Sequence, residues 1–251
     1  MSDRIRDQEV IIIVSDIHFG RSPRQDTDLV DQLTACLRSY GNHLKELILL
    51  GDVFDAYLEY PNTTVPAVEI IRPLLEELLF RNVIVTYHVG NHDPWHLSFF
   101  KTEFAISVVE GSVKRIVNRR HVYLSHGDKE AKRGLGASIS RHFMRTPIYY
   151  RIYRWVLPAK IGQRLPEWVS RKYANPQINR RTVQSLRAAA ARILHSEDID
   201  TVIMGHCHEQ SDENMLGGHY YNSGSWFVDL SYLEIRPNTV LTEKWKRERP
   251  G

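Results

Sequence analysis

Short apolar runs alternate with longer amphipathic segments along this chain. The apolar runs are rich in β-branched residues and leucine, and they predict buried strands. We place these strands at residues 9–14, 47–50, 83–89, 112–117, 121–124 and 201–204. The amphipathic segments repeat apolar residues every three or four positions, which predicts helices at residues 27–40, 65–80 and 182–195.

The predicted helix at residues 27–40 has the clearest ends, with Asp26 as the expected N-cap and Gly41 as the C-terminal stop. Within residues 65–80, Pro73 is expected to bend the helix. Residues 219–245 predict further strands with a turn around Pro237. A βαβ beginning and a β-rich end together predict an α/β fold in which two sheets form a sandwich.

Residues 129–181 interrupt this alternation of strands and helices. The segment is rich in Arg, Tyr, Trp, Phe and Pro, and its prolines divide it into pieces long enough for two or three helical turns. These prolines stand at positions 147, 158, 166 and 176. We therefore expect a helical cap at residues 129–181, inserted within a single domain that covers residues 1–251.

The net charge of +3 hides a strong asymmetry. From Gly127 to Arg192 the chain has 15 Lys or Arg residues and three acidic residues, a net of +12. The remainder has 18 basic and 27 acidic residues, a net of −9. Basic blocks are typical of surfaces that bind phosphate, nucleic acid or anionic lipid, and a solvated surface is the other interpretation.

Composition is that of a globular protein, with 42% hydrophobic and 25% charged residues. No run of about 18 apolar residues occurs, so no membrane span is expected. The first residues have no apolar segment of a secretory signal, which favours a reducing cytoplasm. Cys36 lies in a helical pattern and is expected in the core. Cys207 should point away from the histidines on either side, so we do not count it as a ligand.

Five short polar motifs follow the predicted strands. They are Asp16-Ile17-His18, Gly51-Asp52, Gly90-Asn91-His92-Asp93, His126-Gly127-Asp128 and Gly205-His206-Cys207-His208. An α/β sheet presents its functional groups at the carboxyl ends of its strands, so these motifs should meet at one edge. Each motif alone is a weak signal, whereas the ordered set of five strongly favours a metal-dependent hydrolase.

The motifs supply two carboxylates, one amide oxygen and four imidazoles as candidate metal ligands. These are Asp16, His18, Asp52, Asn91, His126, His206 and His208. A single catalytic zinc takes three protein ligands and a water, so seven are too many for one ion. The set fits two divalent ions about 3.5–4 Å apart that share Asp52. Mixed ligation suits Mn, Fe or Zn better than Mg alone, and we expect Mn.

His92 and Asp93 remain as candidate catalytic residues. Because His92 is adjacent to Asn91, it should point in a different direction and meet the substrate rather than a metal. Asp93 could orient the imidazole of His92 and raise its basicity. His92 would then stabilise the charge that develops on phosphorus and protonate the leaving oxygen.

The five motifs resemble the signature blocks of the calcineurin-like metallophosphoesterases, and they extend from Asp16 to His208. The resemblance implies an αββα sandwich of two mixed sheets. It also implies one metal held by Asp16, His18, Asp52 and His208 and a second held by Asp52, Asn91, His126 and His206. His92 then takes the position of the family's catalytic histidine.

Within that superfamily the chain is most similar to bacterial UDP-2,3-diacylglucosamine diphosphatases of lipid A synthesis. The similar features are the residues 50–55, the residues 125–128, the basic and aromatic insertion, and the residues 222–226. The best-known members have Arg in place of His92, and Cys207 replaces a commoner Thr. The resemblance implies that UDP-2,3-diacylglucosamine is hydrolysed to UMP and 2,3-diacylglucosamine 1-phosphate.

The insertion is expected to hold this lipid-linked nucleotide at the cytoplasmic face of an anionic inner membrane. Among its cations stand apolar residues that suit an acyl chain better than a nucleic acid backbone: Val156, Leu157, Ile161, Leu165, Trp168 and Val169. Arg171 and Arg181, on either side of Asn175, are the predicted diphosphate contacts. We expect no nucleic acid partner and infer no obligate protein partner.

Two alternatives remain open at this point. The first is a general phosphodiesterase, nuclease or protein phosphatase on the same scaffold, with the basic insertion binding a phosphate backbone. The second is a non-catalytic interaction scaffold that kept the fold. Such a scaffold would be expected to have lost metal ligands, whereas all seven are present here.

Overall fold

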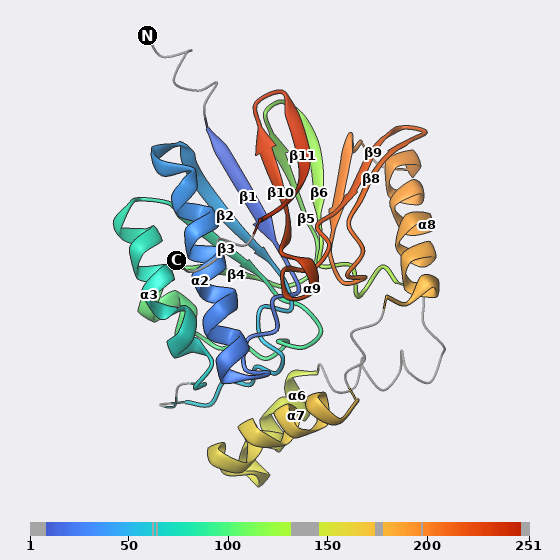
Figure 1. Ribbon diagram of the computed structural model, residues 1–251. Coiled ribbons are helices and arrows are strands. Elements are labelled where there is room, and N and C mark those ends of the chain that lie inside the picture. Colours follow the sequence, from blue (N-terminus) through green and yellow to red (C-terminus); the bar gives the residue numbers. More distant parts are fainter. Residues whose placement is uncertain are drawn as a thin grey trace.

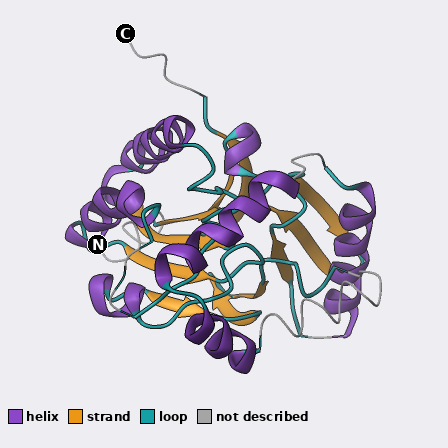
Figure 2. Ribbon diagram, turned by 90° about the horizontal axis from the view of Figure 1, so that it is seen from below, coloured by secondary structure: helices purple, strands orange, loops and turns teal. Residues whose placement is uncertain are grey.

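Two mixed β-sheets face each other at the centre of the molecule, and helices cover their outer faces (Figure 1). The computed structural model describes residues 9–61, 63, 65–131, 146–173, 178–196 and 198–246. The same layers are visible from below, where helices flank the sheets on both sides (Figure 2). The predicted two-sheet α/β sandwich is therefore confirmed.

The first sheet has the strand order β11-β10-β1-β2-β3-β4. Its strands are β1 (Val10–Val14), β2 (Leu44–Leu50), β3 (Ile84–His88), β4 (Ser107–Val109), β10 (Ser231–Arg236) and β11 (Thr239–Lys244). Strands β1 to β4 are parallel to one another, whereas β10 and β11 pair antiparallel. The carboxyl ends of the four parallel strands therefore lie along one edge of the sheet.

The second sheet has the order β5-β6-β7-β9-β8. Its strands are β5 (Val113–Val117), β6 (Arg120–Leu124), β7 (Thr201–Met204), β8 (Ser211–Met215) and β9 (Gly218–Asn222). Strands β5 and β6 form the predicted antiparallel hairpin, and β6 runs parallel to β7. The motifs that follow β6 and β7 thus emerge at a common edge.

The helices divide between the two outer faces (Figure 1). The first sheet is covered by α2 (Pro23–Ser39) and α3 (Val68–Phe80), with α4 (Phe99–Phe104) beside α3, and the second sheet is covered by α8 (Arg180–Ser196). Two short helices, η1 (Gly41–His43) and α9 (Trp226–Asp229), lie in connections. No helix among the described residues has the length and apolar content needed to cross a membrane.

The predicted start of α2 at Asp26 is wrong, because the helix begins at Pro23 with Ser22 in the N-cap position. Proline suits the first turn, since its fixed φ is already helical and its missing N–H would have no partner there. The carboxylate of Asp26 lies inside the first turn and accepts a hydrogen bond from the backbone N–H of Gly20 at 3.1 Å.

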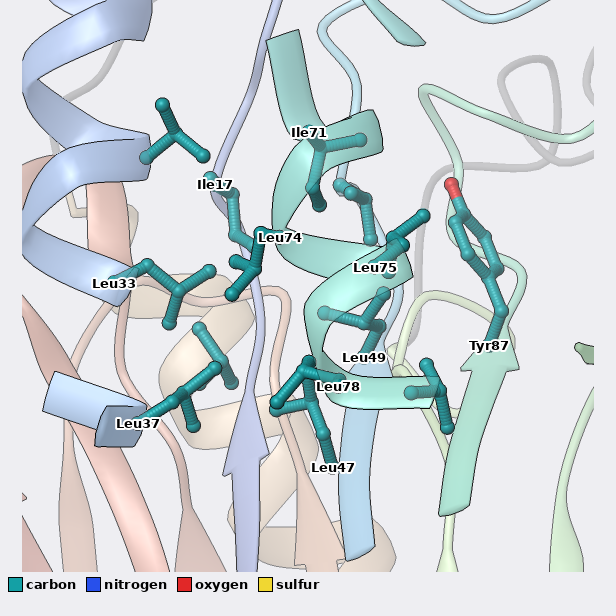
Figure 3. Packing of buried hydrophobic residues seen from close by; sticks show 14 of the residues in the cluster. Ile17, Leu33, Leu37, Leu47, Leu49, Ile71, Leu74, Leu75, Leu78 and Tyr87 are labelled. Carbon is teal, nitrogen blue, oxygen red and sulfur yellow. The ribbon is translucent and has the colours of Figure 1, made fainter. Parts of the chain in front are cut away.

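Alternation along the central strands builds two separate apolar layers. Ile12 and Leu49 point toward the helices, whereas Ile13 and Ile48 point toward the second sheet. Figure 3 shows the helical layer, in which leucines of α2 and α3 meet leucines of β2. A third apolar cluster joins α8 to the outer face of the second sheet.

A charged contact also links the two sheets. Arg115 of β5 donates two hydrogen bonds to the carboxylate of Glu46 of β2, at 2.7 and 2.5 Å. Glu46 is buried, and Thr86 of β3 donates to the same carboxylate at 3.2 Å. Because a bidentate guanidinium–carboxylate pair has a fixed geometry, it adds an oriented contact to the apolar layer between the two sheets.

Helices α6 (Pro147–Val156) and α7 (Ala159–Tyr173) lie beyond the carboxyl ends of the strands (Figure 1). The expectation that each piece of the insertion spans two or three turns is wrong for α7, because Pro166 lies inside this 15-residue helix and does not end it. Residues 132–145 and 174–177 of the predicted cap lie outside the described residues. The limits 129–181 stay a prediction.

An aromatic cluster attaches α6 and α7 to the loop that follows β2. Tyr150 packs with Leu58 and Tyr60, and its hydroxyl donates to the carbonyl of Glu59. The hydroxyl of Tyr60 in turn donates to the carbonyl of Leu157 at 3.0 Å. The loop after β2 carries Asp52, so the two helices are fixed to the same loop as a predicted metal ligand.

The helical core layer gives a stability prediction. Leu33→Ala should lower the free energy of unfolding by about 2–5 kcal/mol, because the fully buried side chain leaves a cavity. Leu216→Ala is the matched control, since Leu216 is 88% exposed and its loss should change stability by less than about 0.5 kcal/mol. Urea titration measures both. Equal effects of the two changes would contradict this packing.

Candidate metal centre

The turns that follow the strands have a conformation that non-glycine residues rarely adopt. Five of the seven predicted ligands have positive φ angles: Asp16 53°, His18 56°, Asp52 51°, His206 69° and His208 58°. The left-handed region is strained for a side chain with a Cβ atom, and residues strained in this way cluster at functional sites. Their concentration at one sheet edge indicates that the fold tolerates strain there to aim these side chains.

Six of the seven predicted ligands gather into two groups whose ligand atoms lie within 4.8 Å of one another. The first group is Asp16, His18 and His208, and the second is Asp52, His126 and His206. In the first, Nε2 of His208 lies 3.2 Å from Oδ1 of Asp16. In the second, Nε2 of His126 lies 3.2 Å from Oδ2 of Asp52. Two separate groups suit two ions rather than one.

The seventh residue, Asn91, provides the clearest test of whether the site fits a metal. Its Oδ1 atom is buried and has no hydrogen-bond partner among the described residues. Buried polar oxygens almost always have a partner, and a divalent cation would supply one without adding negative charge. The donor set of carboxylate, amide oxygen and imidazole therefore fits divalent ions.

Hydrogen bonds orient the ligands so that one atom of each is left for an ion. Because a carbonyl can only accept, Nδ1 of His126 donates to the carbonyl of Leu50 at 2.8 Å, which leaves Nε2 for the metal. One oxygen of Asp16 accepts from the Ser15 hydroxyl at 2.5 Å and from the His206 N–H at 3.0 Å. The other oxygen is the one beside His208.

Neighbouring charges oppose the effect of burial on the pKa values of Asp16 and His126. Burial alone would raise the pKa of Asp16, but His208 and His126 lower this pKa to about 2. Burial would lower the pKa of His126, yet the Asp52 carboxylate raises it well above its usual value. His206 has its pKa lowered to about 3, chiefly by burial. Two buried carboxylates thus make the centre attractive to cations.

Two motif glycines are required because other atoms approach them closely. A Cβ atom on Gly90 would lie 2.2 Å from Oδ1 of Asp52, and one on Gly51 would lie 2.5 Å from the ring of His126. No side chain fits at either distance. The glycines therefore allow the ligands of neighbouring strands to pack against the backbone.

His92 lies at the centre, but its ring partner is not the expected one. Its backbone N–H donates to Oδ1 of Asp52 at 2.7 Å, and its Nδ1 donates to the carbonyl of Asp55 at 2.9 Å. The imidazole ring lies 4.9 Å from that of His18, centroid to centroid. The prediction that Asp93 orients the ring of His92 is wrong, because the carbonyl of Asp55 does so.

Asp93 instead joins two loops. Its carboxylate accepts hydrogen bonds from the hydroxyl of Tyr87 at 2.6 Å and from the N–H groups of Gly90 and Val53, each at 2.7 Å. The N–H of Asp52 also donates a hydrogen bond to the Asp93 carboxylate, at 3.3 Å. Asp93 therefore fixes the loop that carries His92 to the loop that carries Asp52, which is a positioning role.

The sequence motifs did not single out Asp55 as a site residue. Its Oδ1 lies 3.4 Å from Nδ1 of His18, the second nitrogen of a predicted ligand. Asp55, His18 and His92 also form a third group of potential ligands. The signal was present in the chain, because Asp55 follows the predicted ligand Asp52 by three positions.

The remaining predicted residues lie outside this centre or outside the described part of the chain. Cys207 points away from the site, as predicted, and its sulfur donates to the carbonyl of Glu209 within the apolar layer under α8. Asn175 lies outside the described residues, and so does the side chain of Arg171. Arg181 is exposed in the first turn of α8. Substrate contacts of these three residues stay a prediction.

Residues 10–210 match the family model described as calcineurin-like phosphoesterase. The chain belongs to the calcineurin-like phosphoesterase family. This metallophosphoesterase family depends on two metal ions, and the two ligand groups fit that requirement. The chain is therefore a hydrolase of phosphoester or pyrophosphate bonds.

Relatives of this phosphoesterase include two proteins named UDP-2,3-diacylglucosamine hydrolase. The protein of Psychromonas ingrahamii is 20% identical over 235 residues, which cover 91% of this chain and 94% of the relative. That of Porphyromonas gingivalis is 23% identical over 221 residues, or 79% and 82% of the two chains. A solved archaeal phosphodiesterase has a TM-score of 0.48 at 12% identity and covers 94% of this chain and 99% of that one.

The geometry gives a metal-binding prediction for Asp52. The wild type should bind two Mn²⁺ ions per chain, and Asp52→Ala should lose both. Because Asp52 is predicted to be a direct ligand, the affinity for the metal should fall by more than the roughly 100-fold found for outer-shell residues. Elemental analysis after dialysis measures the stoichiometry. Asp31→Ala, at an exposed carboxylate of α2, should retain both ions. An active wild type with a single ion would contradict the two-metal centre.

Proposed function

We propose that this phosphoesterase hydrolyses the pyrophosphate bond of UDP-2,3-diacylglucosamine to give UMP and 2,3-diacylglucosamine 1-phosphate. The observation that carries the proposal is a pair of exposed apolar helix faces beside a centre built for two metals. Three relatives named for this substrate, at 20–23% identity, support it.

Helices α6 and α7 expose apolar residues with the same spacing. On α6 these are Ile148, Ile152 and Trp155, at 70%, 56% and 87% exposure, and on α7 they are Ile161, Leu165 and Trp168, at 57%, 41% and 57%. Positions i, i+4 and i+7 lie on one helix face. Exposed apolar patches mark sites of interaction, and acyl chains are apolar ligands that would cover these two faces.

Cations accompany these apolar faces. Arg151, Lys160 and Arg164 are exposed on the same two helices. Basic and apolar residues together on short helices suit binding at the interface of an anionic membrane, where each cation contributes about 1 kcal/mol of attraction. We propose that residues 129–181 form the cap that holds the lipid part of the substrate at the cytoplasmic surface of this membrane. Arg171, Asn175 and Arg181 are proposed to contact its diphosphate.

The seven ligands would hold two divalent ions, for which we propose Mn²⁺. When bound, the ions polarise phosphoryl oxygens and make water nucleophilic at neutral pH by lowering its pKa toward about 7. Water adds to one phosphorus atom as the bridging P–O bond breaks, and the leaving oxygen takes a proton. His92 is proposed to give that proton from Nε2, because its Nδ1 is held by the carbonyl of Asp55.

The role of His92 gives a prediction that separates catalysis from ligation. His92→Ala should keep both metal ions, while kcat should fall about 10²–10⁴-fold, the usual effect of losing a positioned acid–base group. Metal analysis and initial rates test the two parts separately. His43→Ala, at an exposed histidine of η1, should leave both quantities unchanged. Loss of an ion in His92→Ala, or an unchanged kcat, would refute the assignment.

The substrate is tested by incubating the Mn²⁺-loaded protein with UDP-2,3-diacylglucosamine and following the products by phosphorus NMR. The expected result is the loss of both pyrophosphate signals and the growth of two phosphate monoester signals. An intact pyrophosphate, with bis-p-nitrophenyl phosphate cleaved by the same sample, would contradict the proposed substrate and leave the phosphoesterase activity in place.

The apolar faces are tested with a variant that combines Ile152→Ser, Trp155→Ser and Trp168→Ser. The ratio of kcat/KM for the diacylated nucleotide to that for bis-p-nitrophenyl phosphate should fall at least about tenfold, since losing one methylene in an apolar pocket costs 10–200-fold in discrimination. The control combines Phe80→Ser and Leu216→Ser, two residues with 87% and 88% exposure outside the cap. The same ratio in both variants would show that the cap does not bind acyl chains.

A further inference from the structure

A pocket of about 360 Å³ lies between α6 and the loops that follow β3 and β4. Its walls include Trp95, His96, Glu110, Lys129 and Arg154. None of the seven predicted metal ligands is among its described lining residues. The pocket is therefore a separate cavity, and its volume is in the range of sites for small ligands.

The pocket nevertheless adjoins the metal centre along the chain. Trp95 follows His92 by three positions, and Lys129 follows His126 by three positions. Both loops leave the sheets at the edge where the metal ligands gather. A substrate that reaches the centre with its phosphorus atom can therefore extend into this pocket.

Three cationic side chains converge on the pocket. Lys129, Arg151 and Arg154 line it, and no ion pair joins any of them to a carboxylate in the described part of the chain. The Nζ atom of Lys129 lies beside Gly111, another lining residue, since a Cβ atom on that glycine would lie 3.3 Å from it. The walls contain one described carboxylate, that of Glu110, so positive charge exceeds negative charge and favours an anion.

Arg154 is held in place by an aromatic ring. Its guanidinium lies 4.3 Å from the centroid of Tyr150, and its Nε atom is buried with no hydrogen-bond partner among the described residues. Tyr150 stacks in turn on Trp95, with centroids 5.6 Å apart and an angle of 4° between the rings. Stacked aromatic walls suit a flat ring system as well as an anion.

Helix α6 separates this pocket from the apolar face of the cap. The pocket is lined by Tyr150, Arg151 and Arg154. The exposed residues Ile148 and Trp155 lie on another face of the same helix. One helix thus presents cations and a stacked aromatic ring on one side and an apolar surface on another. That division matches a molecule with a charged nucleotide half and an apolar half.

We propose that this pocket binds the half of the substrate that is released as a nucleoside monophosphate. This inference rests on the proposed hydrolysis of a nucleotide-linked pyrophosphate. Lys129 and Arg154 pair with the phosphate, and the aromatic walls stack on the base. Glu110 accepts hydrogen bonds from the ribose hydroxyls, as acidic residues do in other nucleotide sites.

Calorimetric titration of the full-length, Mn²⁺-loaded protein with UMP, uridine and inorganic phosphate tests this assignment. UMP should bind more tightly than phosphate or uridine alone. Lys129→Ala and Arg154→Gln should each raise the Kd for UMP about tenfold, the effect of losing one charged hydrogen bond. Arg192→Ala, at an exposed arginine of α8 that does not line the pocket, is the matched control and should bind UMP as the wild type does.

The outcomes separate this proposal from the proposed substrate. Lys129 is exposed, so Lys129→Ala decides the question even if Arg154→Gln does not fold. An unchanged Kd for UMP in Lys129→Ala would overturn the pocket assignment. Equal wild-type affinities for UMP and inorganic phosphate would overturn it too, because the nucleoside would then contribute nothing. If UMP binding depends on Lys129 but UDP-2,3-diacylglucosamine is not cleaved, the pocket assignment is supported and the proposed substrate is contradicted.

Discussion

The site depends on two carboxylates that are buried together at the edge of the sheets. Asp16 and Asp52 are 0% and 1% exposed, and their pKa values are lowered by histidines although burial opposes this. Ionised groups in such a place are costly unless cations accompany them. The left-handed turns, the glycines that admit close contacts and the hydrogen bonds of Asp93 keep these two carboxylates in place. The resulting centre fits divalent metal ions.

That the candidate ligands gather at one place could be predicted from sequence, because each one follows a strand that the hydrophobic pattern reveals. Strand ends converge in an α/β sheet, so order along the chain was enough to bring Asp16 and His206 together. The role of Asp93 could not be predicted, since it depends on backbone N–H groups of a loop 40 residues away. The sequence pattern did not predict that α7 continues through Pro166, nor that the short helix α4 forms. Tertiary packing can stabilise a helix whose local sequence is unfavourable, and a local pattern does not contain that packing.

The two helices beyond the sheets are proposed to connect the chemistry to the choice of substrate. Their aromatic attachment to the loop after β2 places α6 beside the loop that carries His92, and one stacked pair, Trp95 and Tyr150, spans both. A change in the position of α6 would therefore shift the loop that carries His92. In this account the fold supplies the phosphoesterase centre, and the insertion adds the walls that select what is hydrolysed.

The central claim is that two ions share Asp52 in one centre. Anomalous diffraction from crystals of the Mn²⁺-loaded protein, with data on both sides of the manganese absorption edge, tests it most directly. The account predicts two manganese peaks about 3.5–4 Å apart, with the Asp52 carboxylate between them. One peak, or two peaks with Asp52 bound to neither or to only one, would contradict it.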